Sequence, residues 1–334
     1  AGGFSVPPGL CLTTEAYDRA LRVPGFSSAE QWQEALRSSG AERRRILFHC
    51  HTILQNYDIR ELTAQFIEQV RLLGLPLSGP WAVRSSATNE DGARASFAGV
   101  YRTRLGIPIE DVGLAVKDIW MSIWDERVLN YHATSELTGA PPAMAIVIHP
   151  LLEASAAGVA YSVHPLTGRA TQVMVNAVAG LAATLVDGRM TPDQYVVEIA
   201  EDNQPIRIGE RTIAGQTQAL RMTDQGLQQM TLSGEALGQA TLSDDQLLTL
   251  ARVAKQVEQT LGHPVDLEWL FDERGLWLLQ ARPISGLGAP RLLTNDDCEW
   301  SRANFKETLP ELPSPLGLSF LEQFMERYIL APYR

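Results

Sequence analysis

Apolar residues recur at helical spacing in four stretches of this chain, with polar residues on the opposite face. The four stretches are residues 29–36, 59–73, 110–131 and 243–262. In the last of them, Ser243 and Gln246 form a capping-box signature and Gly262 supplies a stop signal. The pattern predicts four helices, and it predicts that residues 110–131 form a single long one.

Short apolar runs bounded by polar, glycine or proline residues predict strands. They lie at residues 81–83, 143–148, 158–163, 172–175 and 194–199. Residues 84–99 are too rich in Ser, Asn, Asp and Gly for a core element, so we expect a functional loop there. Residues 201–242 are polar and weakly patterned, which indicates loops and short strands. Helices and strands together predict an α+β fold.

Residues 265–283 alternate between apolar and polar positions on both sides of a turn sequence, which predicts a β-hairpin. The sequence Glu273-Arg274-Gly275 suits a three-residue loop with glycine in the left-handed conformation. In that register Asp272 lies opposite Leu276, and one face of the hairpin is apolar. This face consists of Leu267, Trp269, Phe271, Trp277, Leu279 and Ala281.

The opposite face of the hairpin carries four polar side chains. The register places Glu268 opposite Gln280 and Asp266 opposite Arg282. Carboxylate and amide oxygens suit Mg²⁺, and a guanidinium binds phosphate oxygens through parallel hydrogen bonds, so this face predicts a site for a metal-bound polyphosphate. A cross-strand salt bridge on a solvated sheet face explains the hairpin equally well.

The composition is that of a globular protein, and 334 residues are enough for two compact units with hydrophobic cores. The net charge of -11 argues against nucleic acid or an anionic membrane surface as the main partner. The three cysteines, Cys11, Cys50 and Cys298, lack metal-ligand spacing, and no apolar run approaches the roughly 20 residues of a membrane span. We therefore expect a cytoplasmic protein without a membrane partner.

Residues 83–101 combine small side chains, hydroxyl groups and the charge of Arg84. Small side chains let backbone N–H groups approach phosphate oxygens, and hydroxyl groups add further donors. The segment is not a Walker loop, since no Gly-Lys-Ser or Gly-Lys-Thr follows a glycine-rich run. Taken alone, such a segment is more often an ordinary loop than a phosphate-binding one.

The polar segment and the hairpin together resemble the nucleotide-binding domain of the phosphoenolpyruvate synthase and pyruvate phosphate dikinase family. The matching segments are residues 4–10, 13–17, 83–92, 95–99, 157–162, 165–168, 188–193, 266–269 and 279–283. They follow one another in the family's order, which is far more specific than any single motif. The resemblance favours a metal-phosphate site on the hairpin over a surface salt bridge.

The resemblance implies an ATP-grasp-like fold in which two lobes, with mixed or antiparallel sheets and flanking helices, clamp ATP. We expect one lobe in residues 1–141 and the other in residues 142–285. Residues 286–334 are expected to form a linker and the start of a helical second domain, because residues 309–320 resemble the entry into the acceptor domain of rifampicin phosphotransferases. The family's glycine-glycine-lysine segment would precede Ala1, so we expect an N-terminally truncated first lobe.

The resemblance also implies a metal and phosphate site. Glu268 and Gln280 would hold Mg²⁺ against the phosphates of ATP, the nucleotide substrate. Arg84 and Arg282 would bind and polarise the transferring phosphoryl groups.

Further contacts with ATP follow from the same resemblance. They would come from Ser96, Gly99, His149, Leu151, Leu152, Thr167 and Asp266. The loop around Gly99 would cover the phosphates, the backbone of residues 149–152 would contact adenine, and Asp266 would support Arg282.

The reaction implied by the family is a dikinase reaction. ATP would pyrophosphorylate a histidine on a separate mobile domain and leave as AMP, and the histidine would pass phosphate to pyruvate or another small molecule such as a rifampicin-like antibiotic. The phosphohistidine and acceptor domains of the same protein would therefore be its partners. None of the six histidines of this chain lies in the expected context of a phosphorylated histidine. His49-Cys50-His51 suggests a metal site, but helical neighbours point apart, which favours a structural role.

Two positions depart from the family pattern. The chain has Gly180-Leu181-Ala182-Ala183 where the family usually has Gly-Leu-Gly-Glu, and Asn176 where an acidic residue is usual. Missing carboxylates would alter metal binding. A catalytically degenerate nucleotide-binding or regulatory module is therefore the competing hypothesis to a phosphotransferase.

Overall fold

The computed structural model describes residues 3–90, 100–134, 141–186, 188, 190–200, 202–223, 226–234 and 238–284. Within these residues the protein consists of helices and antiparallel sheets, as the predicted α+β class requires. The predicted loop residues Ser96 and Gly99 and the predicted linker and helical start at 286–334 lie outside the described residues. No helix in the described part of the chain is long and apolar enough to cross a bilayer.

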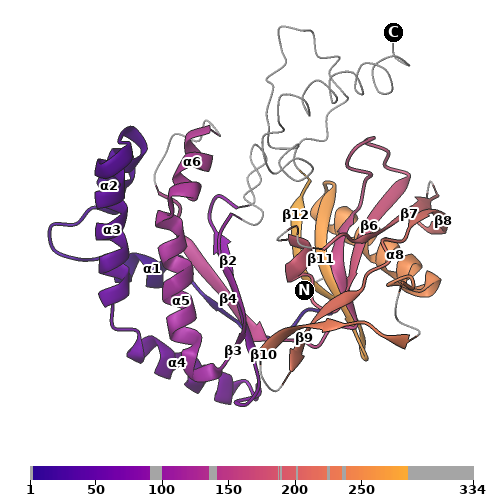
Figure 1. Cartoon of the computed structure of the whole chain (residues 1–334), viewed down its shortest axis with the longest axis horizontal. Coiled ribbons are helices and arrows are strands. Elements are labelled where there is room, and N and C mark those ends of the chain that lie inside the picture. Colours follow the sequence, from indigo (N-terminus) through magenta and orange to yellow (C-terminus); the bar gives the residue numbers. More distant parts are fainter. Residues whose placement is uncertain are drawn as a thin grey trace, which may run out of the picture. The chain divides into compact units, whose positions relative to one another are not determined.

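A four-stranded antiparallel sheet, with strand order β1-β4-β2-β3, organises the N-terminal half, residues 3–150. Its strands are β1 (Leu10–Leu12), β2 (Trp81–Ala87), β3 (Thr103–Ile107) and β4 (Met144–Pro150). The helices are α1 (Thr14–Ala20), α2 (Ser28–Arg37), α3 (Gly40–Asn56), α4 (Arg60–Leu72), α5 (Val112–Met121) and α6 (Glu126–Thr134). Figure 1 shows these helices gathered on one side of the sheet. The face they cover holds the first hydrophobic core, in which Trp32, Trp81, Trp120 and Trp124 are fully buried.

Two predictions for this half need correction. Residues 110–131 do not form one helix, because the 3₁₀ turns Ile109–Asp111 and Ser122–Trp124 flank α5 and Asp125 has extended backbone angles before α6. The apolar stripe continues across this break, since Trp124 and Val128 are both fully buried, so periodicity alone does not reveal it. Residues 84–87 do not belong to a loop but continue β2, where they pair with β4. Arg84, Ser85 and Ser86 are polar because they lie on the partly exposed part of that strand, whereas Ala87 is buried.

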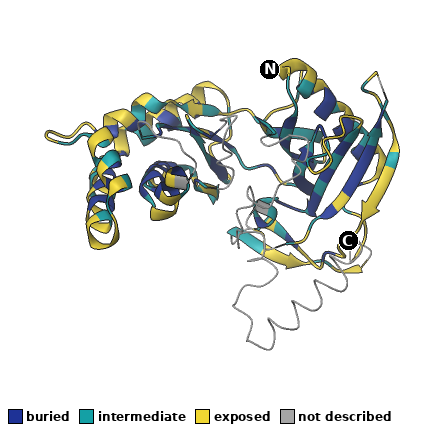
Figure 2. Ribbon diagram, turned by 90° about the horizontal axis from the view of Figure 1, so that it is seen from above, coloured by how far each residue is buried: buried dark blue, intermediate teal, exposed yellow. Residues whose placement is uncertain are grey.

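A six-stranded antiparallel sheet, with strand order β12-β11-β5-β6-β7-β8, organises the C-terminal half, residues 151–284. Its strands are β5 (Ala156–Tyr161), β6 (Gln172–Ala179), β7 (Asp193–Ile199), β8 (Pro205–Thr212), β11 (Val265–Asp272) and β12 (Gly275–Pro283). The helix α8 (Asp244–Leu261) packs on this sheet and closes the second core (Figure 2). Its capping box at Ser243 and Gln246 and its left-handed Gly262 confirm the predicted helix ends.

The polar segment 201–242 contains more regular structure than its composition predicts. Its strand β8 is eight residues long and pairs with β7 at the edge of the main sheet. Most of β8 is exposed, because an edge strand has a neighbour on one side only, and this explains its polar sequence. The two remaining strands, β9 (Gln218–Thr223) and β10 (Gly226–Thr231), form a separate hairpin. A short helix, α7 (Ala183–Val186), completes this half.

The hairpin β11–β12 has the predicted polar pairs but a different turn. Asp272 lies opposite Gly275, because its carboxylate accepts the backbone N–H groups of Arg274 (2.8 Å) and Gly275 (3.1 Å) and closes a two-residue turn. The register then shifts between Glu268 and Trp269, where β12 contributes one extra residue, Leu279.

The shorter turn and the shift together change the faces of the hairpin. The shift restores the predicted pairs, Glu268 with Gln280 and Asp266 with Arg282. The shorter turn places Trp277 opposite Leu270, and Trp277 and Leu279 pack with Leu270 in a small third cluster instead of on the predicted apolar face. Leu276 and Leu278 pack against the second core instead.

Candidate functional site

A cavity of about 600 Å³ is lined by β2, β3 and β4 of the first sheet and by β5, β11 and β12 of the second. Most of the predicted site residues of the described chain line it. They are Arg84, His149, Leu151, Leu152, Glu268, Gln280 and Arg282. These residues come from segments far apart in the sequence, so the tertiary structure brings together what the motifs only suggest separately.

Two predicted residues do not line the cavity. Asp266 lies opposite Arg282 in the hairpin register, next to the site. Thr167 is exposed in the turn after β5, where its backbone N–H donates to Nδ1 of His164 at 3.3 Å.

One end of the cavity is polar, and an arginine joins the two predicted metal ligands there. The Nη2 group of Arg84 donates to the carboxylate of Glu268 and, at 3.1 Å, to Oε1 of Gln280. Oxygens of Glu268 and Gln280 therefore converge on one cationic nitrogen. This donor set fits Mg²⁺, which binds few protein oxygens and takes its other ligands from phosphates and water. The described residues contain no cluster of three or more His, Cys, Asp or Glu side chains that could hold a metal by themselves.

A second ion pair at this end was missed by the sequence analysis. Oε1 of Glu90 accepts a hydrogen bond from Nη2 of Arg282 at 2.7 Å, and both side chains are buried. Glu90 follows β2, whereas Arg282 belongs to β12 at the far end of the chain. The only sequence signal was an acidic residue within a segment otherwise suited to donating hydrogen bonds to phosphate.

The other end of the cavity is apolar, with Ala82, Ala157, Leu152, Leu181 and Leu270 in its lining. His149 lies here on β4, and its Nδ1–H donates to the carbonyl of Pro150 at 2.9 Å. Burial lowers the pKa of His149 below its usual value, so the ring is neutral at neutral pH. A flat, uncharged ring system suits this end, and an anionic group suits the other.

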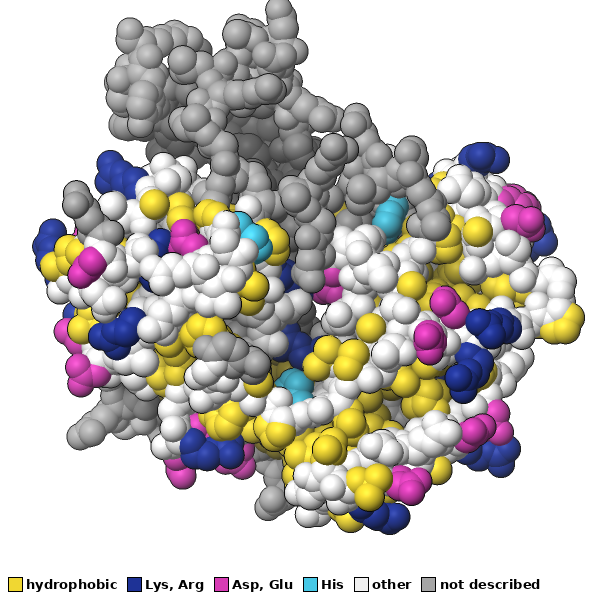
Figure 3. Space-filling view, turned by 180° about the vertical axis from the view of Figure 1, so that it is seen from behind, with side chains coloured by type: hydrophobic (Ala, Val, Ile, Leu, Met, Phe, Trp, Pro, Cys, Tyr) yellow, Lys and Arg dark blue, Asp and Glu magenta, His cyan; other side chains and the backbone are white. Residues whose placement is uncertain are grey.

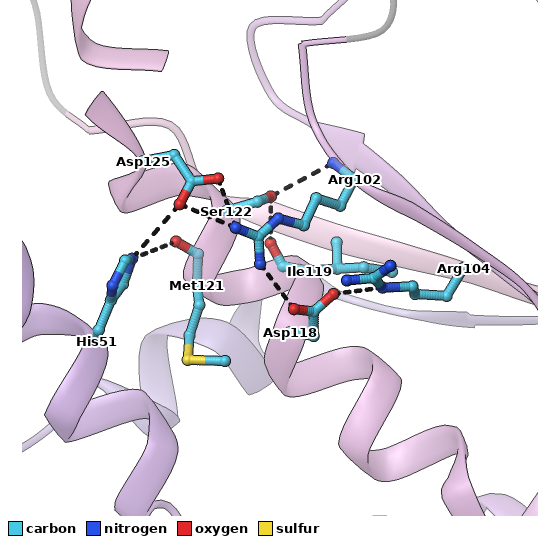
Figure 4. A network of polar contacts seen from close by, with 8 residues as sticks. All are labelled: His51, Arg102, Arg104, Asp118, Ile119, Met121, Ser122 and Asp125. Atoms are coloured by element: carbon cyan, nitrogen blue, oxygen red, sulfur yellow. Dashed lines mark hydrogen bonds and ion pairs between the residues drawn. The ribbon is translucent and has the colours of Figure 1, made fainter. Parts of the chain in front are cut away.

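Two further arginines also line the cavity: Arg102, which directly precedes β3, and Arg104 on β3. Figure 4 shows how carboxylates on the helical side hold them: Arg102 donates to Asp118 (2.7 Å) and Asp125 (2.8 Å), and Arg104 donates to Asp118 (2.5 Å). The contact between Arg102 and Asp125 ties β3 to the break between α5 and α6.

His51 belongs to this network as well. Its Nε2 lies 3.0 Å from the Met121 carbonyl and 3.7 Å from Asp125, while the neighbouring Cys50 is fully buried in the core. The side chains of His49-Cys50-His51 therefore have separate surroundings, since His49 packs on the ring of Phe26. This arrangement agrees with the structural role expected for the tripeptide.

A buried histidine fixes the chain just beyond β2. Nε2 of His132 lies 2.8 Å from Nδ2 of Asn89, and Oδ1 of Asn89 accepts a hydrogen bond from the hydroxyl of Tyr101 at 2.9 Å. Only the unprotonated Nε2 can accept from the Asn89 amide. Burial lowers the pKa of His132 from 6.5 to about 4, which keeps this nitrogen unprotonated.

This depressed pKa leads to a prediction for stability. The unfolded state binds more protons than the folded state between about pH 6.5 and pH 4, so His132 makes the free energy of unfolding fall as pH drops through that window, by up to about 3 kcal/mol. We expect His132→Gln, which cannot titrate, to remove this part of the pH dependence in urea unfolding at a series of pH values. Identical pH profiles for the unaltered protein and His132→Gln would contradict the role assigned to His132. His149 is present in both proteins, so its contribution cancels in the comparison.

The two departures from the family pattern lie in or near the cavity. Ala182 and Ala183 line it with methyl groups. Asn176 lies on β6, and its side-chain oxygen is buried without a hydrogen-bond partner among the described residues. Neither position removes the charged residues of the polar end.

The cavity thus combines an apolar end with a polar end that offers guanidinium groups and a pair of metal-binding oxygens, which is the chemistry of a nucleotide site. The family model described as pyruvate phosphate dikinase, AMP/ATP-binding domain, matches residues 1–292. The chain belongs to this family.

Curated relatives agree with this assignment. The prodigiosin synthesizing transferase PigC of Serratia marcescens is 33% identical over 99% of this chain and 36% of its own length. A probable phosphoenolpyruvate synthase of Pyrococcus abyssi is 28% identical over 85% of this chain and 40% of its own. A rifampicin phosphotransferase of Streptomyces sviceus is 28% identical over 96% of this chain and 37% of its own. The chain therefore spans well under half the length of these relatives.

Proposed function

We propose that this chain is the ATP-binding part of a larger phosphotransferase of the dikinase type, with an ATP-grasp-like arrangement of two lobes around the nucleotide. The match to an AMP/ATP-binding domain and the longer relatives support this proposal. The proposed lobes are residues 1–141 and 142–285, followed by a linker and a helical domain from residue 286.

The charge of the cavity carries the proposal. Its lining contains the five arginines Arg84, Arg102, Arg104, Arg127 and Arg282, against the two carboxylates of Glu90 and Glu268, and Asp118 and Asp125 on the helical side add two more. The whole chain has a net charge of -11. On the described part of the face drawn in Figure 3, charged side chains of both signs are interspersed. An excess of cations in one cavity of an acidic protein favours a polyanion there, and ATP supplies both the polyanion and a ring system for the apolar end.

The proposed binding mode follows the two ends of the cavity. The backbone of residues 149–152 would contact adenine beside the apolar lining, and Arg84 and Arg282 would bind the phosphates. Ser96 and Gly99 would cover the phosphates, while Thr167 and Asp266 would contribute from the margin of the site. The resemblance to the family assigns these roles.

Glu268 and Gln280 would hold Mg²⁺. The ion would supply positive charge that neutralises the phosphates. The same two side chains accept hydrogen bonds from Arg84 in the structure. The Arg84 guanidinium therefore lies beside the proposed metal ligands, where it would donate paired hydrogen bonds to phosphate oxygens.

The proposed reaction transfers the β,γ-pyrophosphoryl group of ATP to a histidine on another domain of the same protein. The histidine nitrogen attacks the β-phosphorus, the bond from the β-phosphorus to the oxygen that bridges it to the α-phosphorus breaks, and AMP leaves with that oxygen. Water then releases the γ-phosphate as inorganic phosphate, and the remaining phosphohistidine passes its phosphoryl group to a small-molecule acceptor. Rifampicin phosphotransferases match 95–96% of this chain and probable phosphoenolpyruvate synthases 85–86%. The greater coverage by the rifampicin phosphotransferases favours an acceptor domain of their type over one of the synthase type. It does not identify the acceptor molecule.

Product analysis tests the proposal directly. The complete protein that carries this chain, incubated with Mg²⁺ and ATP labelled in the α-phosphate, is expected to form AMP. With the label in the β-phosphate, it should acquire an acid-labile, base-stable phosphohistidine. Formation of ADP as the only nucleotide product would contradict a dikinase reaction.

The same experiment tests the alternative of a catalytically degenerate regulatory module. No observation on the described residues favours it, since Arg84, Glu268, Gln280 and Arg282 all line the cavity. Binding of Mg-ATP without any nucleotide product would establish that alternative.

A further inference from the structure

Glu90 ends a tight turn that directly follows β2. Its backbone N–H donates to the carbonyl of Ala87 at 3.0 Å, and its Oε2 accepts the backbone N–H of Ala87, also at 3.0 Å. The turn is thus closed by both the backbone and the side chain of one residue. The carboxylate is 5% exposed, so its position is set by the protein and not by solvent.

The second oxygen of this fixed carboxylate faces Arg282. Oε1 of Glu90 accepts from Nη2 of Arg282 at 2.7 Å, a short contact typical of a charge-assisted hydrogen bond. Arg282 also lines the cavity, although its side chain is only 9% exposed. A guanidinium has five N–H donors in one rigid plane, so it can bind a fixed acceptor and a ligand at the same time.

A buried guanidinium without a counter-charge would be strongly destabilised, so the Glu90 carboxylate also stabilises the charge that Arg282 carries. Two other carboxylates lie near the Glu90–Arg282 pair, and their contacts differ from those of Glu90. Glu268 contacts Arg84, and Asp266 lies opposite Arg282 on the neighbouring strand. Glu90 reaches Arg282 from the N-terminal half of the chain.

We propose that Glu90 is a positioning residue for phosphoryl transfer: it holds the guanidinium of Arg282 in the plane in which that group meets the phosphate oxygens of ATP. This inference rests on the proposed function, because it assigns Arg282 to phosphate. Glu90 itself touches no reacting atom.

Two physical effects of Glu90 on ATP binding have opposite signs, which makes the inference testable. The negative charge of Glu90 repels phosphate, so a purely electrostatic role predicts that its neutralisation tightens ATP binding. If Glu90 positions Arg282, neutralising Glu90 should instead weaken ATP binding, because a neutral amide holds a guanidinium less firmly than a carboxylate does. Glu90→Gln separates the two, since glutamine keeps an oxygen for the Ala87 N–H and removes only the charge.

The experiment compares two ligands by calorimetry on the complete protein. One is the α,β-methylene analogue of ATP with Mg²⁺, which cannot be cleaved at the linkage broken in the reaction, and the other is AMP, which lacks the β- and γ-phosphates. We expect Glu90→Gln to weaken the analogue about tenfold, which is about 1.4 kcal/mol, with little change for AMP. A variant that is partly unfolded would instead lose binding sites for both ligands equally.

Controls separate this inference from the proposed function. Glu110→Gln makes the same chemical change at an exposed carboxylate outside the cavity lining and should leave both affinities unchanged. In an Arg282→Lys background, Glu90→Gln should have a much smaller effect on the analogue, because the group it positions is gone. The inference is overturned if Glu90→Gln binds the analogue as tightly as the unaltered protein or more tightly. It is also overturned if Glu90→Gln weakens binding of the analogue just as much in the Arg282→Lys background. The proposed function stands in both cases. Failure of the unaltered protein to bind the analogue overturns both.

Discussion

Replacing Glu268 with alanine is expected to lower AMP formation by the complete protein at least about a thousandfold, because phosphoryl transfer depends on electrostatic neutralisation of the phosphates. Glu268 supplies the negative oxygen of the proposed metal pair, and Gln280 supplies only a neutral amide oxygen. The loss should appear as a lower kcat with Mg²⁺ and ATP both saturating, measured with α-labelled ATP.

Glu268→Gln refines this expectation. Glutamine can still accept the hydrogen bond from Arg84 that Glu268 accepts in the structure, so the fold around the cavity should persist. A metal-ligand role requires that the Mg²⁺ concentration for half-maximal activity rises strongly, since a carboxylate binds Mg²⁺ better than an amide does. Glu273→Ala, at an exposed position in the turn of the same hairpin, is the matched control and should retain full activity. Activity of Glu268→Ala within tenfold of the unaltered protein would refute the assigned role.

Asp193→Ala is expected to lower the free energy of unfolding by about 3–5 kcal/mol, the largest stability effect that we expect. Asp193 begins β7 and is fully buried. Its carboxylate accepts hydrogen bonds from the backbone N–H and hydroxyl of Thr241 (2.8 and 2.6 Å), the N–H of Ala214 (2.9 Å) and the hydroxyl of Tyr195 (3.2 Å). Alanine would leave the buried Tyr195 hydroxyl and the partly buried donors of Thr241 and Ala214 without this acceptor.

The effect of Asp193→Ala extends beyond one side chain. Ala214 and Thr241 lie on either side of the segment that carries β9 and β10, so Asp193 fixes both ends of that segment to the main sheet. Urea unfolding measures the loss, and Asp202→Ala is a suitable control because the exposed Asp202 accepts one local hydrogen bond from the Gln204 N–H. A loss for Asp193→Ala that is no larger than the loss for Asp202→Ala would contradict this account.

Local patterns predicted some of the helices, although α1 and the 17-residue α3 were not among them. The helices at 29–36, 59–73 and 243–262 were predicted close to their observed ends, since helical spacing and capping involve residues within one or two turns. The break at Asp125 was not predicted, because the apolar stripe runs on through it and the contact of Asp125 with Arg102, just before β3, is tertiary.

The hairpin shows how far register can be inferred from sequence. Alternation correctly paired Glu268 with Gln280, although the predicted three-residue loop was wrong. The turn is one residue shorter, closed by the Asp272 carboxylate, and the extra Leu279 in β12 restores the register. The alternation of polar and apolar residues predicts the average register of a strand but does not reveal a bulge. The bulge depends on packing on both faces of the hairpin. Here Trp277 packs with Leu270 on the face opposite the second core.

The sequence by itself determined the α+β class, the family and the residue types of the site, because each follows from local spacing or from motifs that occur in order. Only the tertiary structure decided which charges meet. Arg84 meets Glu268 across 184 positions of the chain, and Glu90 meets Arg282 across 192. No periodicity links such distant residues, and they become neighbours only because two separate sheets each bury one face in a core and direct polar residues into a shared cavity.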